Sequence, residues 1–169
     1  MDAIALEKPI TARSCQGVVR FLHKAPCAFL PMASFRELQF IAGRGIEGDR
    51  YSVSHETGFH SHKPEDGRQV TLFEMETLET LHRDHGIKLL PEEHRRNVTV
   101  EGVALNLLVG RRFRVGETIL EAIRLSTRCR HIEEILEKAV FGPLTNRSGL
   151  NCKIIVGGTV RVGDIERPA

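Results

Sequence analysis

The chain has 169 residues, and its 24 lysines and arginines nearly balance 22 aspartates and glutamates, which leaves a net charge of +2. This balance excludes a general electrostatic field for nucleic acid or anionic lipid, so any basic site must be local. The length fits a single domain, 1–169, with one hydrophobic core. No apolar run reaches the length of a signal-peptide core or the about 20 residues of a membrane span, so we expect a cytoplasmic protein without nucleic-acid or membrane partners.

Short β-type runs dominate the chain, with glycines between them. In chain order they are 18–22, 38–41, 69–73, 97–100, 113–115, 118–123 and 153–156. Together they predict a compact, mainly β domain. The last run continues through Gly157 and Gly158 into 159–162, and because a Gly-Gly pair tolerates the positive φ angles of tight turns, we expect a β-hairpin there.

Two segments have helical spacing instead. In 74–85 the apolar residues share one side, and Gly86 is placed to end the helix. The second segment, 132–140, has one apolar stripe with acidic residues near its start. We expect both helices to pack against the sheet. The polar, histidine-rich stretch 51–67 lacks either period and is expected to form a long loop.

The four cysteines are widely scattered and include no CxxC pair: Cys15, Cys27, Cys129 and Cys152. This spacing predicts free thiols in a reducing compartment. Three of them have unremarkable surroundings and are interpreted as small buried apolar residues: Cys15, Cys27 and Cys152. A redox pair that involves one of these three is the alternative.

Cys129 has a different local sequence. Four basic residues lie within five positions of it: Arg124, Arg128, Arg130 and His131. It also comes just before the second helical stripe, where backbone N–H groups point outward and Ser126 or Thr127 can supply the cap. Because nearby cations and helix N-termini lower the pKa of a thiol, this context favours a thiolate that serves as nucleophile, sulfur carrier or soft-metal ligand. The alternative is again a small buried residue.

Several short motifs follow one another along the chain. They are GIEGDR at 45–50, RQVTLF at 68–73, RRNV at 95–98, LVG at 108–110, Cys129, RSGL at 147–150, GG at 157–158 and VGD at 162–164. Each is weak alone, but the ordered set, over about 17–166, resembles the MOSC family, the C-terminal domain of molybdenum cofactor sulfurases. The sequence departs from similar proteins at Arg128, where proline is common, and at 60–64 (HSHKP), where many have Gly-Gly after a histidine.

The resemblance implies a β-barrel-like fold with a few peripheral helices. It also implies that Cys129 either carries sulfur as a persulfide or ligates molybdenum in a pterin-bound cofactor. Such a cofactor carries a phosphate, which arginines and backbone N–H groups can hold. The candidate residues for binding molybdopterin are Asp49, Arg95, Arg96, Asn97, Arg147, Ser148 and Gly149.

Each candidate has a structural alternative. Arg147, Ser148 and Gly149 resemble an anion-cradling turn, because arginine supplies a fork, serine a hydroxyl and glycine close backbone approach. Arg95 and Arg96 can equally form a solvated strand entry.

The remaining polar candidates lie in two loops. Asp49 either bonds nearby backbone in a turn or orients a cofactor group, and the role of Arg50 is left open. The loop histidines His55, His60 and His62 are more consistent with a surface loop than with a zinc site, since no further ligand stands at a zinc spacing.

Three functions are compatible with these features. The first is a molybdenum-cofactor-binding or sulfur-carrier domain that works through Cys129. The second, implied by the resemblance, is a molybdenum-dependent reductase of N-hydroxylated compounds that receives electrons from a separate protein. The third is a non-catalytic regulatory or binding module. The chain is too short to include a pyridoxal-phosphate domain, so that cofactor would belong to a separate cysteine desulfurase partner.

Overall fold

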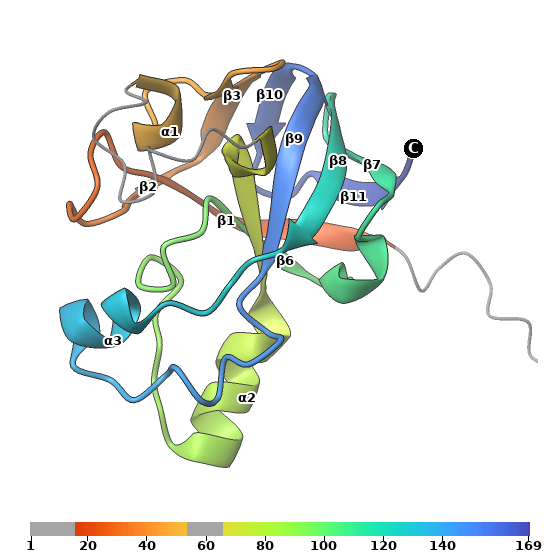
Figure 1. The fold of residues 1–169 in the computed structure, drawn as a ribbon. Coiled ribbons are helices and arrows are strands. Elements are labelled where there is room, and N and C mark those ends of the chain that lie inside the picture. The colour runs from red at the N-terminus through yellow and green to blue at the C-terminus, as the bar shows by residue number, and fades with distance from the viewer. Residues whose placement is uncertain (1–15, 54–65) are drawn as a thin grey trace, which may run out of the picture.

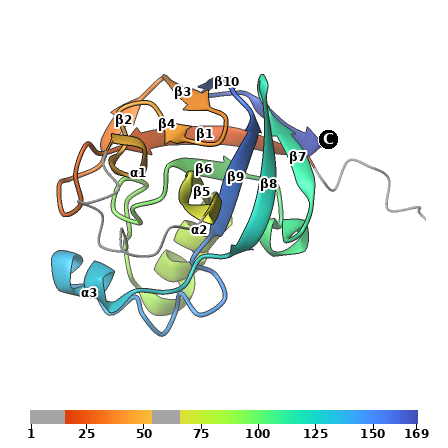
Figure 2. The ribbon, with the colours of Figure 1, turned by 45° about the horizontal axis from the view of Figure 1, so that its top comes forward.

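The structure, a computed structural model, describes residues 16–53 and 66–169. Seven strands in these residues close into a barrel (Figures 1 and 2). In order around the barrel they are β11 (Ile165–Pro168), β7 (Arg112–Val115), β8 (Thr118–Leu125), β9 (Leu150–Val156), β5 (Val70–Glu74), β6 (Val98–Glu101) and β1 (Gly17–Lys24). Pairing of Gly17 with Glu166 closes the ring between β1 and β11. The short strand β2 (Ala33–Phe35) pairs with the end of β1.

The barrel core follows from the period of two along each strand. On β7 and β8 the buried side chains of Phe113, Val115 and Leu120 alternate with more exposed ones, so one face of each strand points inward. Burial of a large apolar side chain of this kind stabilises the fold by about 1.5–3 kcal/mol. The mainly β, barrel-like fold is confirmed.

A second sheet of three strands extends the same core. Its order is β10 (Gly158–Arg161), β3 (Glu37–Ile41) and β4 (Gly45–Ile46). Leu38 and Phe40 on β3 and Val160 on β10 are buried among the barrel residues. The two sheets therefore share one interior.

The predicted hairpin at 153–162 is wrong. β9 pairs with β5 and β8, whereas β10 pairs with β3, so the chain passes from one sheet to the other at Gly157 and Gly158. A Cβ atom on Gly157 would lie 2.7 Å from the carbonyl oxygen of Phe40. The glycine at 157 thus permits the close approach of β3 and does not form a tight turn.

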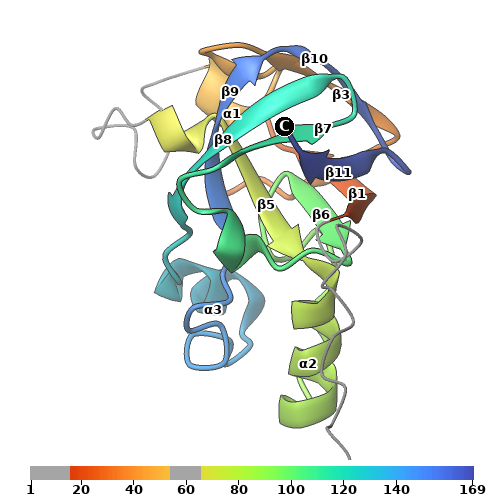
Figure 3. The same ribbon diagram turned by 90° about the vertical axis from the view of Figure 1, so that its right-hand side faces the viewer.

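Two helices lie beyond one end of the barrel, α2 (Met75–His85) and α3 (Arg130–Leu136) (Figures 1 and 3). α2 matches its prediction and ends at Gly86, which has a φ of 65°. α3 is shorter than the predicted 132–140, because Glu137 adopts a left-handed φ of 52°. The side chains of this end form a second apolar cluster: Phe73, Leu78, Leu81, Leu89, Ile132, Val140 and Leu144. The helices meet the sheet at its end, through Phe73 of β5, and do not lie across its face.

The sequence-based strands all occur, with boundaries shifted by a few residues. The prediction of a loop over 51–67 covers part of α1 (Arg50–Val53) and part of η2 (Asp66–Arg68), a single 3-10 turn, and its middle lies outside the described residues. Another 3-10 turn, η3 (Leu105–Leu108), follows β6. In 16–53 and 66–169 no helix is long and apolar enough to span a membrane.

Three cysteines lie in the described residues, and all three are free thiols. Cys152 is fully buried, as expected, and burial raises the pKa of its thiol. Cys27 is exposed, which corrects its interpretation as a buried residue. Cys15 lies outside the described residues.

Candidate functional site

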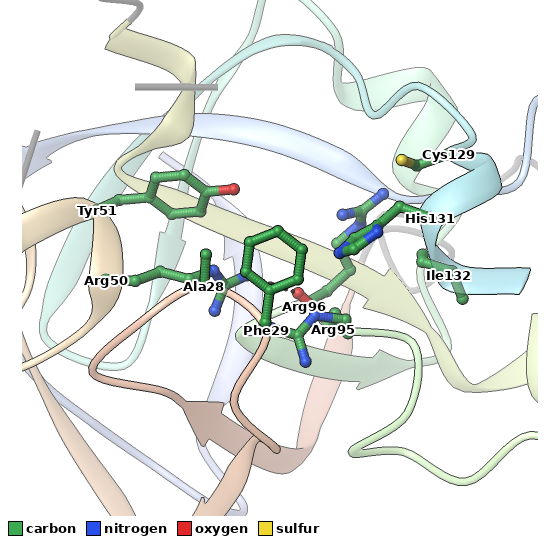
Figure 4. A pocket seen from close by; sticks show the side chains of 9 residues that line it. All are labelled: Ala28, Phe29, Arg50, Tyr51, Arg95, Arg96, Cys129, His131 and Ile132. Atoms are coloured by element: carbon green, nitrogen blue, oxygen red, sulfur yellow. Dashed lines mark hydrogen bonds between the residues drawn. The ribbon is translucent and has the colours of Figure 1, made fainter. Parts of the chain in front are cut away.

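A pocket at the helical end of the barrel brings Cys129 together with several cations. It encloses about 500 Å³, part of it open to solvent. The residues that line it are Ala28, Phe29, Arg50, Tyr51, Arg95, Arg96, Cys129, His131 and Ile132 (Figure 4). None of these nine side chains is acidic, so the pocket has a positive local charge although the chain is nearly neutral.

Four segments far apart in the sequence supply these side chains. They are the segment after β1, the start of α1, the turn before β6 and the start of α3. Figure 4 shows Arg50 and Tyr51 on one side of the pocket, Cys129 and Ile132 on the other, and Phe29 between them. Tertiary packing therefore builds the site, and no local motif contains it.

Asp49 and Asn97 do not line the pocket, but they form a buried hydrogen-bond network next to Arg50. Asp49 is fully buried, and its carboxylate accepts hydrogen bonds from the backbone N–H of Ala25 at 3.2 Å and from the Asn97 side-chain amide at 3.3 Å. The Asn97 side chain also donates to the carbonyl of His23 and accepts from the backbone N–H of Thr71. A buried carboxylate with these partners fixes the backbone from which Arg50 projects.

Arg50 extends from this network into the pocket. One Nη atom lies 3.5 Å from the Asp49 carboxylate and 3.0 Å from the Met32 sulfur, and the other donates to the carbonyl of Arg95 at 3.1 Å. The guanidinium also lies 4.8 Å from the centre of the Tyr51 ring. These contacts fix the orientation of an almost completely buried cation.

Arg95 has an uncommon backbone conformation, with a φ of 62°. Its guanidinium donates to the carbonyl of Leu30 at 2.8 Å. Burial and the nearby charge of Arg50 both lower the pKa of Arg95. A lowered pKa means that the cation is poorly solvated here, so an anion in the pocket would stabilise it.

Arg96 is held from behind by Ser148. Its Nε donates to the Ser148 carbonyl at 2.9 Å, and one Nη donates to the Ser148 hydroxyl at 3.0 Å and to the Thr127 carbonyl at 3.3 Å. Burial lowers the pKa of Arg96 to about 10, and the nearby Tyr51 opposes this shift in part. The arginine is thus oriented by neutral groups only, which leaves its charge available to a ligand.

The buried ring of His94 fixes the backbone between these two arginines. Its Nδ1 accepts a hydrogen bond from the Arg96 backbone N–H at 3.0 Å, so Nε2 carries the proton and donates to the Thr99 hydroxyl at 2.8 Å. Burial holds the pKa of His94 well below its ordinary value. This histidine is therefore a neutral structural group.

Cys129 occupies the position just before α3 and is half-buried. No side-chain hydrogen bond caps this helix, so the expected cap by Ser126 or Thr127 is wrong. Ser126 instead bonds the side chain of Asn151, inside the barrel end.

The residues on either side of Cys129 do not line the pocket. The guanidinium groups of Arg128 and Arg130 lie over the Phe141 ring, 4.1 and 5.0 Å from its centre, and Arg128 also bonds the Thr145 hydroxyl. The cations that do share the pocket with Cys129 are Arg50, Arg95 and Arg96, which are distant in sequence. His131 is the exception among the flanking residues, and its ring makes an edge contact with Phe29, with centres 4.7 Å apart.

Comparison with known proteins identifies the family. Residues 59–165 match the sequence profile of the MOSC domain. The chain belongs to the MOSC family. No curated protein sequence matches it.

Solved structures share the fold of this MOSC domain at low sequence identity. YuaD from Bacillus subtilis is 19% identical with a TM-score of 0.76, and the match covers 91% of this chain and 97% of YuaD. YiiM from Geobacillus stearothermophilus is 8% identical with a TM-score of 0.70, and the match covers 90% of this chain and 75% of YiiM. YiiM from Escherichia coli is 16% identical with a TM-score of 0.61, and the match covers 89% and 69% of the two chains. These likenesses show the fold alone.

The candidate residues of this MOSC domain occupy three kinds of position. Cys129, Arg95 and Arg96 line the pocket, whereas Asp49, Asn97 and Ser148 support it from beneath or behind. Gly149 has a φ of 100°, and a Cβ atom there would lie 2.1 Å from the carbonyl oxygen of Leu72. Glycine is therefore needed at position 149 because β5 packs closely against the start of β9.

Arg147 lies apart from the Cys129 pocket. It is exposed and lines a different hollow, together with Glu74, Glu76 and Asp84. Ser148, the next residue, is buried and its hydroxyl accepts a hydrogen bond from Arg96. The anion-cradling turn predicted for 147–149 is therefore divided between two faces.

Sequence reasoning missed Phe29 and Tyr51 as lining residues and left Arg50 open. The sequence signal for Arg50 is its place at the end of the GIEGDR motif, 45–50. His55, His60 and His62 lie outside the described residues, and the described part of the chain contains no group of three His, Cys, Asp or Glu that could hold a metal ion.

Proposed function

We propose that this MOSC domain binds an anionic, pterin-type molybdenum cofactor in the Cys129 pocket, with the Cys129 sulfur as a protein ligand to molybdenum. One observation carries the proposal: a half-buried thiol shares a pocket with three arginines, and no carboxylate lines that pocket. Thiolate is a soft ligand that suits such a metal, and guanidinium groups suit a phosphate.

The residues present fit this group in both charge and ligand chemistry. Arg95 and Arg96 would hold the phosphate, since their own hydrogen bonds are to neutral oxygens of Leu30, Thr127 and Ser148. Arg50 would add positive charge deeper in the pocket. Asp49, Asn97 and Ser148 orient these arginines without touching the ligand. The bound metal would supply two-electron redox chemistry, while the half-buried Tyr51 and the buried Ile132 would limit the access of water.

The partial exposure of Cys129 also favours a sulfur-carrier role as a second candidate function. The Cys129 thiolate would attack the outer sulfur of a persulfide on a partner, which forms the new S–S bond and releases the partner thiolate. Sulfur moves without any net oxidant. A cysteine desulfurase with its own pyridoxal phosphate is the class of partner that this step needs, whereas reductase activity would need an electron-transfer protein.

Anaerobic reconstitution tests the proposal. The full chain, Cys129→Ser and the matched control Cys27→Ser are incubated with the free molybdenum cofactor and separated by gel filtration, and bound molybdenum is measured. We expect about one molybdenum per chain for the unchanged protein and for Cys27→Ser, and a strong loss for Cys129→Ser. Equal molybdenum in all three proteins would contradict the role of Cys129 as ligand.

A parallel incubation separates the two functions. A cysteine desulfurase and free cysteine are added to the same three proteins, and intact-protein mass spectrometry then measures a gain of one sulfur atom. A gain on the unchanged chain and on Cys27→Ser, but not on Cys129→Ser, would support the carrier role. No gain combined with Cys129-dependent molybdenum binding would leave the cofactor-binding function alone.

A further inference from the structure

A second cavity opens beside the Cys129 pocket, and its walls are mainly apolar. It encloses about 510 Å³, a volume that includes space open to solvent. The apolar side chains around it are Phe29, Pro31, Met32, Ile135 and Leu136. Phe29 and Ile135 remain 59% and 39% exposed, so this apolar surface is not covered by the described residues.

Phe29 and Arg95 line both cavities and separate them. Both have a positive φ, 70° for Phe29 and 62° for Arg95, which bulky residues rarely adopt. The hydrogen bond from Arg95 to the Leu30 carbonyl, 2.8 Å long, joins the two segments. Residues held in rarely populated backbone conformations cluster at functional sites, and here two such residues lie between the cavities.

Helix α3 connects the two cavities on its inner side. Cys129 and Ile132 line the first cavity, and Ile135 and Leu136 line the second. The step from Ile132 to these residues is about one helical turn, or roughly 5 Å along the axis. A compound with the length of a substituted aromatic ring is therefore long enough to reach both.

The two cavities differ in their charge. The first is lined by three arginines, whereas the second has Glu92 and Glu93 in its wall beside Arg95. Glu93 is bound to the Lys138 amine at 2.7 Å and to the Leu90 backbone N–H at 2.7 Å. Lys138 and Arg95 balance these two carboxylates, and the apolar walls of the second cavity disfavour any unpaired charge.

We propose that the second cavity is a substrate compartment that takes an uncharged apolar group, about the size of an aromatic ring, while the polar end of the same compound reaches the Cys129 pocket. This inference rests on the proposed function, which puts the chemistry beside Cys129. Phe29 is then a specificity-determining residue, because its ring lies where the compound passes from one cavity to the other.

Methyl NMR on the full chain tests the compartment without any cofactor. The protein, labelled at methionine and isoleucine methyl groups, is titrated with benzyl alcohol, a neutral aromatic probe. We expect saturable shifts of the Met32 and Ile135 methyl signals and none of Ile165, which lies on β11.

In Ile135→Asp the apparent affinity for benzyl alcohol falls by about tenfold or more, because a charge replaces apolar contact. Ile165→Asp, a matched exposed isoleucine, retains the wild-type affinity. Shifts that do not saturate, or that are equal at all three residues, would overturn the inference.

Paired phosphate probes test the connection between the cavities. Phenyl phosphate is expected to bind about tenfold more tightly than inorganic phosphate, and this ratio should fall to about one in Ile135→Asp. If inorganic phosphate binds but the two probes have equal affinity, the inference fails and the anion pocket of the proposed function stands. If phosphate does not bind at all, the proposed clamp fails, and the benzyl alcohol titration still decides whether the apolar compartment exists.

Discussion

Arg96 donates hydrogen bonds to both the carbonyl and the hydroxyl of Ser148, at 2.9 and 3.0 Å. The contact joins the turn before β6 to the residue that precedes β9 by two positions, across 52 positions of sequence. Both acceptors are neutral, so the guanidinium is held in place while its charge is not cancelled. This relationship explains how a nearly neutral chain forms a local anion pocket.

Replacing Arg96 should weaken anion binding in the pocket. We expect Arg96→Gln to lower the affinity for inorganic phosphate by about tenfold, because a charge-assisted hydrogen bond is lost. Isothermal titration calorimetry measures the affinity. Arg147→Gln removes an arginine that lines a different hollow and should bind phosphate as the unchanged chain does. Equal losses in both variants would mean that the phosphate responds only to net charge.

Replacing Asp49 should destabilise the fold beneath the pocket. Asp49→Ala leaves the Ala25 N–H, the Asn97 amide and the buried Arg50 without their shared acceptor, at a cost of about 3 kcal/mol. Urea unfolding followed by circular dichroism measures the loss. The matched change Asp84→Ala removes an exposed carboxylate that pairs with Arg83, and we expect no change of the unfolding midpoint. An unchanged midpoint in Asp49→Ala would show that the buried network is not needed.

A side chain at position 149 should not fit. Gly149→Ala combines a positive φ with a Cβ atom 2.1 Å from the Leu72 carbonyl oxygen, so β5 and β9 must separate. We expect a loss of about 3 kcal/mol or failure to fold, measured as the urea midpoint or as soluble yield. Gly142→Ala is the control, because a Cβ atom there meets nothing within 4 Å. Similar midpoints for the two variants would contradict the assigned close approach.

A buried carboxyl group where β1 and β11 close the barrel should make the stability of the fold depend on pH. Glu166 lies opposite Gly17 on β11, and its burial raises the pKa of the carboxyl to about 7, with only partial compensation from the Gly17 backbone N–H. A raised carboxyl pKa means that the folded state retains the proton that the unfolded state loses near pH 4.3. Stability contributed by the protonated form is therefore complete below about pH 4 and is lost as the pH rises to about 7.

The variant Glu166→Gln imitates the protonated carboxyl. At pH 8 we expect it to be more stable than the unchanged chain by about 2 kcal/mol, and at pH 4.5 the two should differ little. Urea midpoints across this pH range provide the comparison. Parallel pH profiles for the variant and the unchanged chain would contradict a raised pKa for the Glu166 carboxyl.

The sequence predicted the barrel well because its strands are short apolar runs with a period of two, and the MOSC motifs added their order. The Gly157-Gly158 hairpin failed because glycine also serves close packing, and no local signal tells the two uses apart. The helix at 132–140 was predicted too long because its stripe includes Val140, which is buried from a loop and not from α3.

The pocket was only half predictable. Arg95 and Arg96 were candidates from their motif, and Cys129 from its basic neighbours, yet Arg128 and Arg130 lie over Phe141 and not against the pocket. The cations that do surround the thiol come from other segments. Phe29 and Tyr51 had no sequence signal, since each reaches the pocket only through the path of its loop in three dimensions.

X-ray absorption at the molybdenum edge of the reconstituted protein tests the central claim most directly, because it counts the sulfur atoms around the metal. Ligation by Cys129 predicts that Cys129→Ser has one sulfur neighbour fewer than the unchanged chain, with Cys27→Ser identical to the unchanged chain. A sulfur shell that is the same in all three proteins would contradict Cys129 as the molybdenum ligand.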